Sequence, residues 1–360
     1  MGISRVLVAN RGEIAVRIIA ACRELGIDTV LATSEADRES LAARLAARVI
    51  CIGPGPAAAS YLDPRRLVCA AQVTDCDALH PGYGFLSESP ELAEACLTEE
   101  ITFVGPRPDQ IRSMGNKVRA RALAAMSGVP TLPGSEGVRT LEEATVVAQR
   151  IGYPVMLKAA AGGGGRGVKV VEIEADLAEG FTVAGAEARA AFTDGTLYVE
   201  RFIRNARHIE VQVLGDQQGT VLHLGERDCS LQRRHQKMVE ESLAPHLTET
   251  HRGEIRAAAV AFARSLGYEN AGTVEFLFDK DSEQFYFLEM NTRLQVEHPV
   301  TEMVTGIDIV QAQLRLAAGE PLWFDQGGVV FRDLGCANEA SRIKIARRRR
   351  AWPDANHSCG

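Results

Sequence analysis

The segment YPVMLKAAAGGGGRGVKVV occupies residues 153–171 and has the composition of two strands joined by a glycine-rich turn. Backbone that lacks Cβ atoms can approach phosphate groups closely and direct its N–H groups at them. The spacing Gly-x-x-x-x-Gly-Lys-Ser/Thr is absent, and a strand rather than a helix follows the glycines, so the turn is not a P-loop. The segment predicts a β-hairpin tip that is either a flap over phosphates or a plain flexible turn.

Lys158 ends the first of these two strands, directly before the turn. A lysine in this place can meet a phosphate, although a solvated lysine at a strand end is a frequent alternative. Further strand-like runs follow at residues 199–202 and 210–214, so this part of the chain has α+β character. Lys158 therefore favours the flap.

Strand and helix patterns alternate upstream of this region. Residues 6–9 form a short apolar run, and residues 13–25 repeat apolar side chains at helical spacing before Gly26. Further apolar runs at 29–32 and 78–80 predict a doubly wound parallel sheet with covering helices. No Gly-x-Gly-x-x-Gly follows the first strand, which argues against a dinucleotide-binding fold. We predict an N-terminal α/β domain at 1–113.

Composition excludes several classes of protein. The formal charge is −7 over 360 residues, which argues against nucleic-acid binding because phosphate neutralisation requires a basic surface. The eight cysteines are scattered, with neither a C-x-x-C pair nor a zinc-site spacing. Without a signal-peptide pattern or an apolar run of membrane-spanning length, the expected compartment is the cytoplasm, with no membrane partner.

Acidic and amide side chains alternate along two predicted strands at 273–278 and 285–291. Glu289 and Asn291 project from one face, and Glu275 lies on the partner strand, so three oxygen ligands can converge. An acidic edge on a solvated sheet is the alternative. Carboxylates among Phe, Leu and Met side chains would be costly if unpaired, which favours a magnesium site.

The next segment offers a cation and a carboxylate four residues apart, Arg293 and Glu297. Glu297 could deprotonate a small acid while Arg293 holds its anion, although the two could also form an ordinary surface pair. A third dense polar block, residues 226–237, is consistent with a solvated loop or a nucleic-acid patch on composition alone.

Taken together, several segments resemble the biotin carboxylases: ANRGEIA at 9–15, HPGYGFLSE at 80–88, the Lys158 flap, and the segments 226–241 and 289–300. The match extends from about residue 3 to residue 322. The family is the biotin-carboxylating component of acetyl-CoA, propionyl-CoA and related carboxylases. The resemblance implies an ATP-grasp domain, placed at 114–325 with a flap subdomain at about 130–203, after the N-terminal α/β domain.

The resemblance also implies roles for individual residues. The general base would be Glu297, and the bicarbonate pocket would contain Lys237, Arg293, Gln295 and Val296. Magnesium, or manganese in its place, would be held by Glu275 and Glu289 with Asn291 nearby. The ATP site would comprise the phosphate lysines Lys117 and Lys158, the flap glycines Gly163, Gly164 and Gly165, the adenine neighbours Glu200 and Ile203, and His208, Gln232 and His235.

The implied reaction begins with deprotonated bicarbonate, which attacks the γ-phosphate of ATP to give carboxyphosphate and ADP. Carboxyphosphate releases carbon dioxide, and biotin on a carrier protein is then carboxylated. The implied partners are a biotin carboxyl carrier protein or domain and a carboxyltransferase component. The resemblance is compatible with a homodimer.

The family pattern breaks at the C-terminal end. Residues 326–360 do not follow it, the family's Cys-Arg-Ile-Asn-Ala-Glu-Asp type segment is absent, and residues 341–360 carry six Lys or Arg and one Asp. We therefore expect a truncated chain without the family's C-terminal domain, ending in a disordered tail. Two alternatives follow, namely an Mg-ATP-binding module with little biotin carboxylation, and a nucleic-acid-binding protein that uses the arginines at 347–350.

Overall fold

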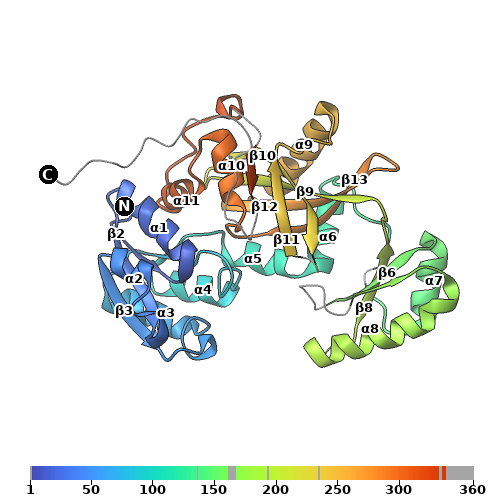
Figure 1. Cartoon of the computed structure of the whole chain (residues 1–360), viewed down its shortest axis with the longest axis horizontal. Helices are drawn as coiled ribbons and strands as arrows, with labels where there is room; N and C mark the ends of the chain where they lie inside the picture. The colour runs from blue at the N-terminus through green and yellow to red at the C-terminus, as the bar shows by residue number, and fades with distance from the viewer. Residues whose placement is uncertain are drawn as a thin grey trace.

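The computed structural model describes residues 2–135, 137–160, 168–192, 194–233, 236–331 and 335–337. The glycine turn and His235 lie outside the described residues, so the roles of Gly163, Gly164, Gly165 and His235 stay predictions. Three sheets organise the chain (Figure 1). Within the described ranges, no helix is both long and apolar enough to cross a bilayer.

The first sheet is parallel and five-stranded, in the order β3-β2-β1-β4-β5, which confirms the predicted doubly wound N-terminal unit. Gly12 has φ +69°, a backbone angle that favours glycine, at the point where β1 gives way to α1. The strands are β1 (Arg5–Val8), β2 (Asp28–Ser34), β3 (Arg48–Gly53), β4 (Ala78–His80) and β5 (Thr102–Phe103). The helices are α1 (Gly12–Glu24), α2 (Leu41–Leu45), α3 (Pro64–Val73), α4 (Pro90–Thr98) and α5 (Pro108–Gly115), so the predicted boundary at residue 113 falls inside α5.

The second sheet is antiparallel and six-stranded, in the order β13-β12-β9-β10-β11-β14. Along β9 the apolar side chains Ile209, Val211 and Val213 pack with α9, while His208, Glu210 and Gln212 alternate with them on the other face. The strands are β9 (Ala206–Gly215), β10 (Val221–Arg233), β11 (Gln236–Ser242), β12 (Asn270–Asp279), β13 (Gln284–Asn291) and β14 (Gly335–Ala337). The accompanying helices are α6 (Lys117–Met126), α9 (Glu249–Ser265), α10 (His298–Thr305) and α11 (Ile309–Ala317).

One apolar core joins the first two sheets. Ile14 and Ile18 of α1 belong to the same buried cluster as Ile309 and Leu314 of α11, together with Leu214 of the second sheet. The ribbon places α1 beside α11 in agreement with this cluster (Figure 1). Continuous apolar contact of this kind holds the N-terminal unit against the second sheet.

The third sheet has three antiparallel strands in the order β7-β6-β8: β6 (Val155–Ala159), β7 (Val168–Val171) and β8 (Leu197–Arg201). Helices α7 (Leu141–Ile151) and α8 (Leu177–Phe192) pack against it, away from the N-terminal unit (Figure 1). Thr140 accepts a hydrogen bond from the backbone N–H of Glu143 and begins α7 with a capping box. The predicted strand pair on either side of the glycine turn is therefore confirmed.

The tail differs in part from its prediction. Val329 is buried, Phe331 packs against the core that joins the first two sheets, and β14 pairs with β11 in an antiparallel register. The expectation of disorder is therefore wrong for residues 326–331 and 335–337. It had rested on composition, which does not reveal that an open sheet edge offers backbone partners. Residues 338–360 lie outside the described ranges.

Candidate active site

A row of charged residues crosses the six-stranded sheet on the face opposite α9. The strand registers place Arg227 of β10 opposite Glu210 of β9, Glu210 opposite Glu275 of β12, and Glu275 opposite Glu289 of β13. Residues paired in this way point to the same face of a sheet. Arg227 and Glu210 are fully buried, and Glu275 is nearly so. The row therefore forms the floor of a buried charged site.

Lys237 of β11 lies over this floor and contacts three carboxylates. Its Nζ is 2.7 Å from Glu297 and 3.2 Å from Glu275, and it also forms an ion pair with Glu210. Burial alone would lower the pKa of Lys237, but the three carboxylates outweigh burial and raise it. Lys237 is therefore a permanent cation that joins the predicted base to a predicted metal ligand.

His208 lies two residues before Glu210 on β9 and shares its face. Its Nε2 is 3.0 Å from Glu210 and 2.9 Å from Glu275. Burial opposes its charge, yet the two carboxylates raise the pKa of His208 to about 10. Burial likewise opposes the ionisation of Glu210, but Lys237 chiefly lowers the pKa of this carboxyl to about 2. This cluster is thus a set of fixed charges at neutral pH.

The three predicted metal ligands are close to one another, each with a protein partner. Asn291 donates from Nδ2 to Glu275 Oε1 at 2.7 Å, and Glu289 lies 3.0 Å from Lys117 Nζ. Among the described residues, the groups of three or more His, Cys, Asp and Glu side chains close enough to share an ion are His208 with Glu210 and Glu275, and Glu210 with Cys229 and Glu297. Neither group includes Glu289. The predicted ligands Glu275, Glu289 and Asn291 offer carboxylate and amide oxygens, which are the ligand atoms that suit Mg²⁺.

Arg293 and Glu297 do not form the surface pair that was one alternative. Arg293 Nε donates to Glu88 of the N-terminal unit at 2.9 Å, and its second terminal nitrogen donates to Asn291 Oδ1 at 3.1 Å. Glu297 is 7% exposed and pairs with Lys237 instead. Gln295 is buried and donates to Glu275 Oε1 at 3.0 Å, whereas the side chain of Val296 is 44% exposed.

A cavity of about 270 Å³ lies beside this cluster, between the six-stranded sheet and the third sheet. Three predicted ATP-site residues line it, namely Lys117, Lys158 and Glu200. Lys158 forms an ion pair with Glu200, and Lys117 begins α6, where Asn116 caps the helix by accepting from Arg119 N–H. Ile203 and Gln232 do not line the cavity. Apolar walls with a few convergent charges suit a nucleotide.

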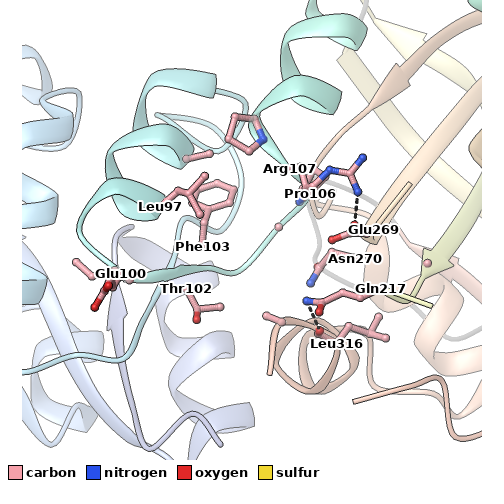
Figure 2. A pocket seen from close by; sticks show the side chains of 16 residues that line it. Leu97, Glu100, Thr102, Phe103, Pro106, Arg107, Gln217, Glu269, Asn270 and Leu316 are labelled. Carbon is pink, nitrogen blue, oxygen red and sulfur yellow. Dashed lines mark hydrogen bonds and ion pairs between the residues drawn. The ribbon is translucent and has the colours of Figure 1, made fainter. Parts of the chain in front are cut away.

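A second cavity, of about 380 Å³, lies where the N-terminal unit meets the six-stranded sheet (Figure 2). Phe103 and Leu97 stand on one side of it, and Gln217 and Asn270 on the other. The ion pair between Arg107 and Glu269 crosses from one unit to the other (Figure 2). None of the predicted site residues lines this cavity.

Sequence reasoning missed two members of the charged floor, Glu210 and Arg227. The signal for Glu210 was present, because polar residues alternate with Ile209, Val211 and Val213 along β9. Arg227 stood within a block that composition alone presented as a solvated loop. Residues 226–233 of that block belong to strand β10 and are buried as far as Cys229, so the loop interpretation is wrong for these residues.

Comparison with known families covers most of the chain. Residues 2–111 match the model of the biotin carboxylase N-terminal domain, and residues 116–324 match that of the carbamoyl-phosphate synthase L chain ATP-binding domain. The biotin carboxylase of Allochromatium vinosum is 54% identical over 336 residues, which are 92% of this chain and 74% of that protein. Biotin carboxylase 1 of Bacillus subtilis is 50% identical over 330 residues, 91% of this chain and 73% of that protein.

Solved structures agree with these matches. A biotin carboxylase from Campylobacter jejuni, described as a complex with β,γ-ATP, superposes with a TM-score of 0.89 at 47% identity, over 93% of this chain and 75% of that one. The biotin carboxylase domain of the Hydrogenobacter thermophilus 2-oxoglutarate carboxylase, described in complex with MgADP, ADP and bicarbonate, superposes with a TM-score of 0.88 at 47% identity. That match covers 93% of this chain and 74% of the other.

Proposed function

The chain belongs to the biotin carboxylase family of ATP-grasp ligases, and we propose that it carboxylates biotin held on a carrier protein, using bicarbonate, ATP and Mg²⁺. The observation that carries this proposal is the place of Lys237, whose Nζ contacts both Glu275 and Glu297. One cation thus joins the proposed metal ligand to the proposed base. A bicarbonate anion bound at this lysine would lie next to both.

On this proposal, ATP occupies the cavity beside the charged floor. Lys117 and Lys158 would meet its phosphates, and Glu200 would lie beside the adenine with Ile203 near it. His208 and Gln232 would complete the side of the site next to the sheet, with the flap glycines and His235 as further contacts. The neighbour described with MgADP and bicarbonate supports this division into a nucleotide region and an anion region.

Glu275 and Glu289 would hold Mg²⁺ or Mn²⁺, with Asn291 as an adjacent oxygen donor. When bound, the ion supplies charge stabilisation for the transferring phosphoryl group. Lys117, the lysine partner of Glu289, would then leave that carboxylate to meet a phosphate. Lys117 would thus exchange an ion pair within the protein for a contact with the ligand.

Glu297 is proposed as the base that takes the bicarbonate proton. Arg293 and Lys237 would hold the anion, with Gln295 and the backbone at Val296 around it. The bicarbonate oxygen attacks the γ-phosphorus, the bond to ADP breaks, and carboxyphosphate forms. Carboxyphosphate then divides into carbon dioxide and phosphate, the phosphate takes the N1′ proton of biotin, and N1′ attacks carbon dioxide. Because Glu275 and Glu297 are buried, water would have little access to these reaction steps.

The proposed partners are a biotin carboxyl carrier protein or domain and a carboxyltransferase component, with a homodimer as the proposed assembly and the cytoplasm as the proposed compartment. A second candidate function is Mg-ATP binding with bicarbonate-dependent ATP cleavage but little biotin carboxylation. One observation favours it: the residues assigned above serve ATP, the metal and bicarbonate, and none of them is assigned to biotin.

The test measures ADP formation from ATP and Mg²⁺ with and without bicarbonate, and carboxybiotin formation from free biotin and labelled bicarbonate. The proposal expects ADP formation to require bicarbonate and to fall at least about 100-fold in Glu297→Gln, which keeps the nucleotide cavity. ADP formation without carboxybiotin would support the second candidate. ATP cleavage indifferent to both bicarbonate and Glu297→Gln would contradict both candidates.

A further inference from the structure

We propose that Arg227 is a positioning residue for bicarbonate, because its guanidinium fixes the direction in which the Gln295 carboxamide presents its N–H groups. The inference rests on the proposed function and deepens it. Arg227 has no contact with the nucleotide cavity, and none of the roles assigned above requires it.

Arg227 is fully buried and holds together several elements. One terminal nitrogen donates to Gln212 Oε1 at 3.0 Å and to Thr301 of α10 at 2.8 Å. The other donates to Gln295 Oε1 at 2.5 Å, to Glu210 Oε2 at 3.3 Å and to Thr273 at 3.4 Å. The guanidinium thus joins β9, β10 and β12 to the segment that carries Gln295.

The chemistry of these groups sets the orientation of the amide. A guanidinium has only donors, so Gln295 must turn its Oε1 toward Arg227 and its Nε2 away from it. In that orientation Nε2 donates to Glu275 Oε1 at 3.0 Å, beside Lys237. A reversed amide would place two N–H groups against the guanidinium and an oxygen against a carboxylate. Arg227 therefore excludes the orientation that would repel an anion.

Stability alone gives little reason for this arrangement. Burying a guanidinium removes it from water, and a well-packed apolar side chain in its place is often neutral or stabilising when the charged partners are replaced too. Its Nε is buried without a hydrogen-bond partner among the described residues. The contacts made by its two terminal nitrogens define geometry next to the site, which is the expected pattern for positioning.

The experiment compares Arg227→Met and Arg227→Lys with Arg256→Met, using bicarbonate-dependent ADP formation. Arg256 is a matched control because it is also a largely buried arginine paired with a buried carboxylate, Glu226, outside the site. We expect Arg227→Met to raise the KM for bicarbonate about tenfold with a change below about twofold for ATP, and Arg227→Lys to recover part of the loss. Arg256→Met should leave the ratio of the two KM values unchanged. Equal rises in both KM values would overturn the inference.

A double-mutant comparison separates positioning from general loss of structure. Because Arg227 acts through Gln295, Arg227→Lys should add little to the bicarbonate KM of Gln295→Leu. Additive effects of the two substitutions on the bicarbonate KM would overturn the inference. This comparison does not need Arg227→Met, so it holds even if that variant fails to fold.

A binding measurement separates the inference from the proposed function. Bicarbonate with MgADP should raise the melting temperature of the wild-type chain and of Arg256→Met, and this rise should shrink in Arg227→Lys. Absence of the rise in wild type would overturn the inference. A preserved rise without turnover would contradict only the proposed function.

Discussion

The lysines of the nucleotide cavity and the lysine of the charged floor differ in their carboxylate partners. Lys117 and Lys158 each pair with one carboxylate, Glu289 and Glu200. The pair of Lys117 is about one-third exposed on both sides, whereas the pair of Lys158 is largely buried. Lys237 contacts three carboxylates that are nearly or fully buried. A single exposed pair opens at little cost, whereas a buried cluster cannot lose a member without leaving charge uncompensated.

This difference separates two tasks within one site. The partly exposed pair of Lys117 opens easily and can give its lysine to an incoming phosphate. The buried cluster keeps its geometry before and after binding, and preorganised charge of this kind stabilises charge that develops during a reaction. The two regions meet at the register pair of Glu275 and Glu289, one residue belonging to each.

We expect the largest effect from a substitution at Glu289, where the two regions meet. Glu289→Gln keeps the size of the side chain but removes a proposed metal ligand, so Mg-dependent ATP cleavage should fall about 100- to 1,000-fold. The exposed Glu142→Gln on α7 is the control and should retain activity. Undiminished cleavage in Glu289→Gln would remove the metal assignment.

A second prediction compares the two kinds of lysine directly, without any ligand. Lys237→Met removes the cation that three buried carboxylates share, and with it the ion-pair partner of Glu297, and should lower the free energy of unfolding by about 3–5 kcal/mol. Lys117→Met should change it by less than about 1 kcal/mol, because its pair is partly exposed. Urea denaturation measures both values, and equal losses would contradict the distinction.

The smallest effect comes from a third cluster, where two carboxylates share one cation. Glu302 and Asp308 lie 2.9 and 2.7 Å from the same Arg17 nitrogen. Burial raises the pKa of Glu302 to about 7 despite Arg17, from an ordinary value of 4.5. The folded state therefore holds a proton that the unfolded chain has lost, and stability should fall as pH rises from 4.5 to about 7, by at most roughly 3 kcal/mol.

Denaturation midpoints across this pH window measure the effect. Glu302→Gln cannot ionise, so it should flatten the dependence, while Glu142→Gln should leave it as in wild type. A profile of Glu302→Gln that matches wild type would show that Glu302 titrates normally.

The sequence allowed much of this site to be predicted where local periodicity carried the information. Alternation along two strands identified Glu275, Glu289 and Asn291, and the structure places Glu275 opposite Glu289. Alternation along the strands did not reveal that Lys237 contacts Glu297, because that contact joins residues 60 positions apart. Contacts of this kind depend on how strands are ordered in the sheet, which periodicity does not specify.

The same limit explains the fold predictions. Strand and helix alternation predicted the parallel sheet, in which three of the four strand pairings join strands that are consecutive in sequence. The order of the six-stranded sheet could not be obtained in this way, because β12 lies beside β9 and β14 beside β11 across long stretches of chain. Glu210 was missed for this reason, since its importance comes from Arg227 on one side and Glu275 on the other.

The short strand β14 has a consequence for how copies of this chain behave toward one another. Its three residues pair with Glu240, Glu241 and Ser242 and so occupy backbone groups of β11 that would otherwise form an open sheet edge. An open edge is a template for strands from other molecules and promotes aggregation. The edge strand on this side of the sheet therefore has only three residues, and so short an edge disfavours edge-to-edge aggregation, an effect separate from any chemistry in the site.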